Sequence, residues 1–287
     1  MRSLSECVGQ AASRLSVGPH PDRARPDAET LLFTTLGKNR AWLLAHLDDE
    51  LPEPAVSRYA EWIERRSFGE PIQYITGEAE FYGLPFHVTR DVLIPRPETE
   101  HAVEKGLELA AQFAAPRIVD VGTGSGAIAV ALAHNLPGAM VTATDLSDAA
   151  LNVARENAGR NRVAGQICFL CGDLLAPVSG ERFDVIVSNP PYVPAGDRAA
   201  LAVEVRDYEP AQALFAGEDG LAIYRRLIPA AFAALVPGGS LVLEIGFGQQ
   251  ASVRALLADS GFGEIGFTAD LQGIPRIACA RLNPRET

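Results

Sequence analysis

This sequence of 287 residues lacks an apolar run long enough to cross a bilayer, because the segment 227–236 is short and contains Pro229. The first six residues lack the apolar core of a signal peptide, so we expect a cytoplasmic protein that does not bind a membrane. The sequence also lacks an excess of basic residues, since 25 Lys and Arg stand against 36 Asp and Glu and give a net charge of −11. Direct binding of nucleic acid usually needs clustered positive charge, so we do not expect it.

Cysteine and histidine are scarce as well, with four and five residues respectively. Cys168 and Cys171 form a C-x-x-C pair, but no second pair accompanies them and no histidine is near. A zinc or disulfide-exchange site is therefore not expected, and we predict no bound metal. All four cysteines fit reduced thiols, and we interpret His87, His101 and His134 as structural or surface residues.

Apolar residues make up 47% of the chain, which is enough for one large domain with a smaller one. Residues 1–76 carry apolar side chains at steps of three and four, with prolines between the segments, and this pattern predicts a small helical domain. Aromatic and β-branched residues flank Gly83, so we expect a β-hairpin linker over residues 77–97. The pattern leaves open whether the helical domain only packs or also binds a partner protein.

Residues 98–287 alternate between strand and helix patterns after a first helix that we expect to extend to about residue 114. Such alternation predicts a mostly parallel sheet with helices on both of its faces. We expect strands at residues 117–121, 140–144, 166–170, 183–188, 240–245, 264–268 and 276–281. We expect helices at residues 127–135, 147–157, 220–235 and 249–259, the third being stopped by Pro237-Gly238-Gly239.

The tetrapeptide Asn189-Pro190-Pro191-Tyr192 follows the apolar strand that begins at Phe183. Two prolines remove two backbone donors and fix two φ angles, so the chain must leave the sheet in a rigid direction. Asn-Pro alone is a common turn signal, but ligands of open α/β sheets bind where strands end. The amide of Asn189, the backbone carbonyls beside it and the ring of Tyr192 could hold a planar amino nitrogen. The tetrapeptide resembles the catalytic segment of enzymes that methylate such nitrogens with S-adenosylmethionine.

A glycine-rich turn, Asp120-x-Gly122-x-Gly124-x-Gly126, follows another strand and opens a helix. Glycines in such a turn allow the backbone to approach a ligand closely. The turn alone would also suit a dinucleotide cofactor. Asp145 ends the next strand, where a carboxylate can accept from both ribose hydroxyls in either kind of fold. S-adenosylmethionine is favoured because Asn189–Tyr192 has no task in hydride transfer.

Asp173-Leu174 ends the third strand of this pattern. A carboxylate there could accept from the amino group of adenine, and Leu174 could pack on the ring. A plain turn after Gly172 explains Asp173 equally well.

Four segments of the chain together resemble the release-factor glutamine methyltransferases, the PrmC/HemK family. The resemblance extends over nearly the whole chain. One of the segments is Asp91–Glu100, and its part Ile94-Pro95-Arg96-Pro97-Glu98-Thr99-Glu100 is the most specific to the family. The other segments are Thr76-Gly77 through Glu80-Phe81, the turn Gly122–Gly126, and Asn189–Tyr192 followed by Glu209-Pro210 and Ala213-Leu214.

The resemblance implies a class I S-adenosylmethionine-dependent methyltransferase fold, which is Rossmann-like with a mostly parallel seven-stranded sheet. It implies methyl transfer to the glutamine of the Gly-Gly-Gln loop of class 1 peptide chain release factors, with S-adenosylhomocysteine as product. The N-terminal domain would dock the release factor, and we expect a monomer. Catalysis and substrate binding are assigned to Asn189, Pro190, Pro191 and Tyr192. Cofactor binding is assigned to Asp120, Gly122, Thr123, Gly124, Ser125, Gly126, Asp145, Asp173, Leu174 and Asn189.

Two alternatives remain beside this interpretation. A DNA or RNA amino methyltransferase of the adenine-N6 type shares the tetrapeptide, but the acidic chain offers no basic insertion to grip phosphates. A protein-binding module that has lost catalysis could keep the fold, but it would have no need for the glycine turn, Asp145 and Asn189–Tyr192.

Overall fold

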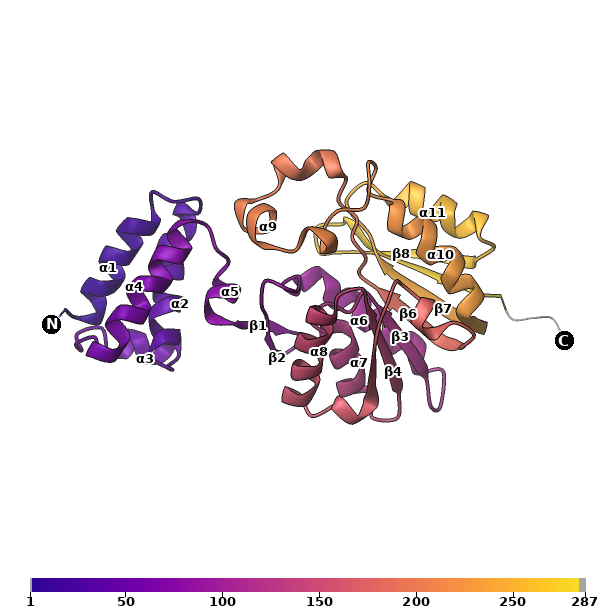
Figure 1. Ribbon diagram of the computed structural model, residues 1–287, viewed down its shortest axis with the longest axis horizontal. Coiled ribbons are helices and arrows are strands. Elements are labelled where there is room, and N and C mark those ends of the chain that lie inside the picture. The colour runs from indigo at the N-terminus through magenta and orange to yellow at the C-terminus, as the bar shows by residue number, and fades with distance from the viewer. Residues whose placement is uncertain (1, 284–287) are drawn as a thin grey trace. The chain divides into compact units, whose positions relative to one another are not determined.

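The computed structural model of the protein describes residues 2–283 (Figure 1). The described chain divides into two compact units, each with its own hydrophobic core. The first unit contains the residues up to Glu78 together with Leu201–Tyr208. The second contains Ala79–Ala200 and the residues from Glu209 on.

The first unit is a small helical bundle whose helices pack through amphipathic faces. In α1 the residues Leu4, Val8, Ala11 and Leu15 are buried, at the three- and four-residue steps that place side chains on one helix face. Ser3 caps this helix, since its side chain accepts from the backbone of Glu6 and the Glu6 carboxylate accepts from the backbone of Ser3. The helices of the bundle are α1 Leu4–Leu15, α2 Ala24–Thr35, α3 Arg40–Ala45, α4 Glu53–Ser67 and α5 Ile72–Thr76.

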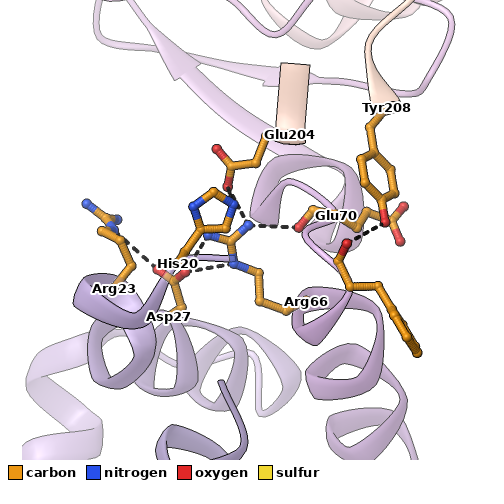
Figure 2. Close-up of polar contacts among 8 residues, drawn as sticks. His20, Arg23, Asp27, Arg66, Glu70, Glu204 and Tyr208 are labelled. Atoms are coloured by element: carbon orange, nitrogen blue, oxygen red, sulfur yellow. Dashed lines mark hydrogen bonds and ion pairs between the residues drawn. The ribbon is translucent and has the colours of Figure 1, made fainter. Parts of the chain in front are cut away.

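A short helix from the C-terminal half of the sequence, α9 Val203–Tyr208, completes the first unit. Figure 2 shows its contacts: Arg66 of α4 lies between Asp27 of α2 and Glu204 of α9 and forms an ion pair with each. The Tyr208 hydroxyl also donates to the Phe68 carbonyl over 3.1 Å. The sequence pattern places residues 201–208 in the second domain, because no local signal reports a pairing with Arg66.

The predicted hairpin is present as β1 Glu78–Phe81 and β2 Leu84–His87. Phe81 and Phe86 are buried, and their rings meet edge to face at 6.0 Å within the core of the second unit. The hairpin from residue 79 on is therefore part of the second unit, not a separate linker. It differs from the expected linker because its two phenylalanines contribute to that core.

The second unit is built on one sheet, which in residues 2–283 has seven strands in the order β5-β4-β3-β6-β7-β9-β8. Neighbouring strands are parallel except for β9, which runs antiparallel to both β7 and β8. The strands β3, β6 and β7 are buried on both faces, as their runs of Val, Ile and Leu predict. The strands are β3 Arg117–Val121, β4 Met140–Asp145, β5 Ile167–Cys171, β6 Phe183–Ser188, β7 Leu235–Glu244, β8 Gly263–Ala269 and β9 Pro275–Arg281.

Helices cover both faces of this sheet (Figure 1). One face is packed by α6 Glu100–Ala110, α7 Ala127–Asn135 and α8 Asp148–Arg160. The other is packed by α10 Ala222–Ala234 and α11 Gln250–Asp259. No helix within residues 2–283 is both long enough and apolar enough to traverse a membrane.

Two predicted element ends differ from the structure by four residues or more. The strand β7 already begins at Leu235 and includes Pro237–Gly239, which were predicted to precede it. These residues are accommodated by a bulge, since the pairing with β6 jumps from Phe183 opposite Leu235 to Val185 opposite Ser240. The helix α6 ends at Ala110, four residues earlier than the pattern suggested.

The strand order positions a binding site. From β3 the chain continues on one side to β4 and β5, whereas β6 and β7 lie on the other side. Ligands of open α/β sheets bind beside such a switch point, at the carboxyl ends of the strands. The strands β3, β4, β6 and β7 end here with Val121, Asp145, Ser188 and Glu244.

Candidate active site

A cleft of about 170 Å³ lies at these strand ends, entirely within the second unit. It brings together most of the residues that the sequence predicts for the site, from the ends of the four strands β3, β4, β5 and β6. Its lining includes Gly122, Thr123, Gly124, Ser125, Asp145, Asp173, Leu174, Asn189, Pro190 and Pro191. Asp120, Gly126 and Tyr192 are not among the described residues that line the cleft.

The glycine-rich turn has the backbone conformation that requires glycine. Gly122, Gly124 and Gly126 have φ angles of +74°, +55° and +82°. A Cβ at Gly122 or Gly124 would meet no atom within 4 Å, so both positions border open space. A Cβ at Gly126 would lie 3.1 Å from the Cβ of Ala154, so this glycine serves the packing of the following helix. Two of the glycines thus leave room for a ligand, and the third permits close packing.

Asp145 joins the turn to the second strand of the site. Its Oδ2 accepts from the Gly124 backbone at 2.8 Å, and its Oδ1 accepts from the Ser147 backbone at 2.9 Å. A carboxylate has about four lone-pair positions, so each oxygen can still accept from a ligand hydroxyl. The predicted ribose contact is compatible with this arrangement.

Asp120 lies behind the cleft and is fully buried. Its Oδ2 accepts from the Thr123 hydroxyl at 2.6 Å and from the Ala129 backbone at 3.1 Å. Burial raises the pKa of Asp120 to about 7, and no described residue forms a hydrogen bond with its Oδ1. Asp120 therefore connects the glycine-rich turn to α7 through hydrogen bonds and does not line the cleft.

Asp173 and Leu174 both line the cleft, but the Asp173 carboxylate forms an ion pair with Arg226. The predicted contact with adenine would have to share or break this pair. Leu174 has a positive φ of +50°, and its carbonyl accepts from the Thr144 hydroxyl at 2.9 Å. This hydrogen bond holds a strained residue at the edge where its side chain is predicted to pack on a ring.

The tetrapeptide divides into two parts. Asn189, Pro190 and Pro191 face the cleft, and the Asn189 Nδ2 donates to the Thr99 hydroxyl at 3.0 Å. The Tyr192 hydroxyl instead donates to the Glu244 carboxylate at 3.3 Å. The predicted stacking of Tyr192 on the substrate stays a prediction, and its hydroxyl has a partner on the protein.

Three residues of the site were given no role in the sequence analysis: Glu244, and the residues Arg96 and Thr99 of the segment Ile94–Glu100. Thr99 donates to Glu244 at 2.6 Å, and Arg96 forms an ion pair with buried Glu209 at 2.6 Å. Burial raises the pKa of Glu244 to about 7, and Glu98 adds to the rise. Glu244 could have been found from the sequence, because its carboxylate directly follows the apolar run Leu241-Val242-Leu243 at a predicted strand end.

Two protein-family models match successive parts of the chain. A family model described as the PrmC N-terminal domain matches residues 6–77, and one described as the methyltransferase small domain matches residues 105–206. The release factor glutamine methyltransferase of Moorella thermoacetica is 47% identical over 254 residues, which are 88% of this chain and 89% of that protein. The chain belongs to the release factor glutamine methyltransferase family.

A second family member, from Koribacter versatilis, is 42% identical over 97% of this chain and 98% of its own length. A solved T. thermophilus 16S rRNA N2 G1207 methyltransferase in complex with AdoMet and guanosine has a TM-score of 0.54 and 20% identity. The match covers 72% of this chain and 50% of that one and shows the fold alone. The chain is therefore an enzyme with a class I methyltransferase fold, and that fold implies S-adenosylmethionine as methyl donor.

The described residues contain no cluster of side chains that could bind a metal ion. Within residues 2–283 no three His, Cys, Asp or Glu side chains are placed to hold a metal ion. Cys168 and Cys171 are both free thiols at the surface.

Proposed function

We propose that this protein transfers a methyl group from S-adenosylmethionine to the side-chain amide nitrogen (N5) of the glutamine in the Gly-Gly-Gln loop of class 1 release factors. The observation that carries the proposal is the orientation of Asn189 at the end of β6. Its Nδ2 is engaged by Thr99, which leaves Oδ1 as an acceptor in a cleft beside the glycine turn. An acceptor suits a substrate that presents N–H groups. The names of the relatives support a release factor as substrate.

The cleft fits the proposed cofactor by shape and by charge. Gly122 and Gly124 border open space, and Asp145 retains acceptor capacity for ribose hydroxyls. Asp91 and Asp145 place carboxylates around a ligand that carries positive charge, whereas the Asp173 carboxylate is already paired with Arg226. When bound, S-adenosylmethionine would supply an electrophilic methyl on a sulfonium and leave as S-adenosylhomocysteine. We propose no metal in this chemistry.

The protein groups act by positioning. An amide nitrogen is a weak nucleophile because its lone pair is delocalised. The Asn189 Oδ1 and the Pro190 carbonyl would accept from the two N–H groups, polarise the nitrogen and fix its direction. Formation of the new N–C bond, with cleavage of the C–S bond, would make the nitrogen acidic, and it would release one proton to water. This sequence of events needs no histidine or cysteine as base.

The helical part, residues 1–76, is proposed to dock the release factor, and residues 98–287 to carry out the chemistry. We further propose a monomer that binds neither nucleic acid nor membranes. The cytoplasmic localisation expected from the sequence stays a prediction.

The test is methyl transfer by the full-length protein with methyl-labelled cofactor and purified release factor. We expect label in the glutamine of the Gly-Gly-Gln loop, and none in RNA or DNA supplied in parallel. Asn189→Ala should lower kcat by about 10²- to 10³-fold, the cost of one preorganised polar contact. Asn152→Ala, on the exposed face of α8, is the control and should keep wild-type activity. Label in nucleic acid alone would favour the amino methyltransferase alternative and overturn the proposal.

A further inference from the structure

Glu244 forms the end of a chain of hydrogen bonds that leads to Asn189. Its Oε2 accepts from the Thr99 hydroxyl at 2.6 Å, and the Thr99 oxygen accepts from the Asn189 Nδ2 at 3.0 Å. The other oxygen, Oε1, faces the Tyr192 hydroxyl at 3.3 Å. Glu244 and Thr99 are 2% and 4% exposed, so water does not compete for these bonds. These contacts connect β7 to the carboxyl end of β6 through Thr99, which directly precedes α6.

The direction of this chain follows from donor counting. A threonine hydroxyl has one hydrogen to donate, and an ionised carboxylate can only accept. Thr99 therefore uses its hydrogen on Glu244 and can offer Asn189 only its lone pairs. The Asn189 amide must then turn its NH2 group to Thr99, which leaves its Oδ1 for the cleft. With the opposite orientation, the cleft would present a donor and would repel the N–H groups of an amide.

We propose that Glu244 and Thr99 are positioning residues that set the polarity of the Asn189 amide and thereby make the cleft select substrates that donate N–H groups. This inference rests on the proposed function, because it assumes that Asn189 receives the substrate nitrogen. It extends that function to residues on two other elements and explains why a buried carboxylate stands at the end of β7.

The surroundings of Glu244 make its protonation state variable near neutrality. The pKa of Glu244 is raised to about 7, chiefly by burial and also by the charge of Glu98, while hydrogen bonds from Thr99 and Tyr192 and the charge of Arg276 act to lower it. The guanidinium of Arg276 is itself paired with Asp270 at 2.9 Å. Thr99, Tyr192, Glu98 and Arg276 are thus the groups that decide whether the carboxyl is charged.

Protonation of Glu244 would reverse the donor and acceptor roles in the hydrogen bonds from Glu244 to Thr99 and from Thr99 to Asn189. A protonated Glu244 can donate to Thr99, which can then donate its own hydrogen to Asn189 and draw Oδ1 away from the cleft. The rate constant kcat should therefore rise with pH through the pKa of Glu244, to a plateau where the carboxylate is ionised. Asp120 also has a pKa raised to about 7, so a variant must show which carboxyl produces the effect.

The experiment compares Thr99→Val, Thr99→Ser, Glu244→Gln and the double variant Thr99→Val/Glu244→Gln in single-turnover methyl transfer to the intact release factor. Thr99→Val removes the hydroxyl at nearly constant shape and should lower kcat about 10- to 100-fold, the scale for misplacement of a reacting group. Thr99→Ser keeps the hydroxyl and should recover most of this loss. Glu244→Gln should lower kcat about tenfold and abolish its rise with pH. The double variant should be no worse than Thr99→Val alone, because both changes interrupt one chain.

Cofactor affinity separates this role from a general structural one. The glycine turn and Asp145 are untouched, so the Kd for S-adenosylmethionine should change less than twofold in every variant. Glu108→Gln, an exposed substitution of the same kind on α6, is the matched control and should keep the wild-type pH profile.

The outcomes are distinguishable. If the wild-type protein does not methylate release factor, the proposed function fails. If it does and Asn189→Ala is impaired, but Glu244→Gln keeps both wild-type kcat and the wild-type pH profile, the polarity chain is wrong. Strictly multiplicative losses in the double variant would also contradict it.

Discussion

Two buried carboxylates of this protein lie in opposite electrostatic environments. Asp27 in the helical unit is 1% exposed and faces Arg66, whose guanidinium lies 2.7 Å away, with Arg23 as a second partner. Glu244 in the catalytic unit is 2% exposed and is held by the hydroxyls of Thr99 and Tyr192. No ion pair involving Glu244 occurs in residues 2–283, although the more distant Arg276 influences it.

The difference separates a structural role from a functional one. A buried carboxylate with a guanidinium partner ties together elements that are distant in sequence. A buried carboxylate held by hydroxyls keeps its ability to change protonation state near neutral pH, which costs stability. The first arrangement occurs where α2, α4 and α9 meet, and the second occurs beside the cleft.

The largest effect on stability is expected from Arg66→Ala. This change leaves Asp27 buried without its main partner and removes one partner of Glu204, whose carboxylate also lies 3.3 Å from the His20 Nε2 (Figure 2). Breaking a buried pair by removing one member costs about 3–5 kcal/mol, so the helical unit should unfold at a much lower denaturant concentration. The control is Arg23→Ala, at an exposed side chain, which should cost less than about 1 kcal/mol. Equal losses in the two variants would show that Arg66 is no more important than a surface arginine.

The second-largest effect is expected in the pH dependence of stability, and it tests the role of Glu244, the other carboxylate of the comparison. Burial raises the pKa of Glu244 from 4.5 to about 7, so between these values the folded protein holds a proton that the unfolded chain has lost. The free energy of unfolding should therefore fall as the pH rises from about 4.5 to 7. Glu244→Gln should remove a decrease on the order of 3 kcal/mol, measured by urea unfolding across this range.

Part of the decrease should remain in Glu244→Gln, because the raised pKa of Asp120 acts with the same sign. Glu108→Gln should leave the whole profile unchanged. A Glu244→Gln variant whose stability falls with pH as steeply as that of the wild type would mean that Glu244 is already ionised at pH 5.

Much of the fold could be predicted from the sequence because its signals are local. The strand Phe183–Ser188 and the helix Ala127–Asn135 have the predicted bounds, and Ser147 caps α8 by accepting from the Ala150 backbone. The bulge at Pro237–Gly239 was missed, since its accommodation depends on the pairing with β6.

The candidate site could likewise be predicted only where its sequence signals are local. Asn189 and the glycine turn are recognisable as local motifs at strand ends. The contacts of Thr99 with Glu244 join residues that are 145 positions apart, and those of Arg66 with Glu204 join residues 138 apart. Such pairings leave no periodic or compositional trace, so only the folded chain reveals them. The same holds for the assignment of α9 to the helical unit.

The smallest predicted effect concerns the segment that carries α9. Its base is closed within the catalytic unit, because the Val193 backbone donates to the Leu214 carbonyl at 2.9 Å and Ala195 donates to Gly217 at 2.8 Å. Its tip is held in the helical unit by Glu204 and by the hydrogen bond from Tyr208 to the Phe68 carbonyl. Tyr208→Phe removes that bond and keeps the ring, so the expected cost is about 0.5–1.5 kcal/mol.

This cost should be local to the tip and leave the base intact. Amide hydrogen exchange should therefore become faster in residues 201–208, and the rates in residues 193–195 and 214–217 should not change. Because the substitution does not touch the Asp27–Arg66 pair, the denaturation midpoint should move far less than in Arg66→Ala. Faster exchange in residues 193–195 and 214–217 as well would contradict the prediction and would mean that the segment opens as one piece.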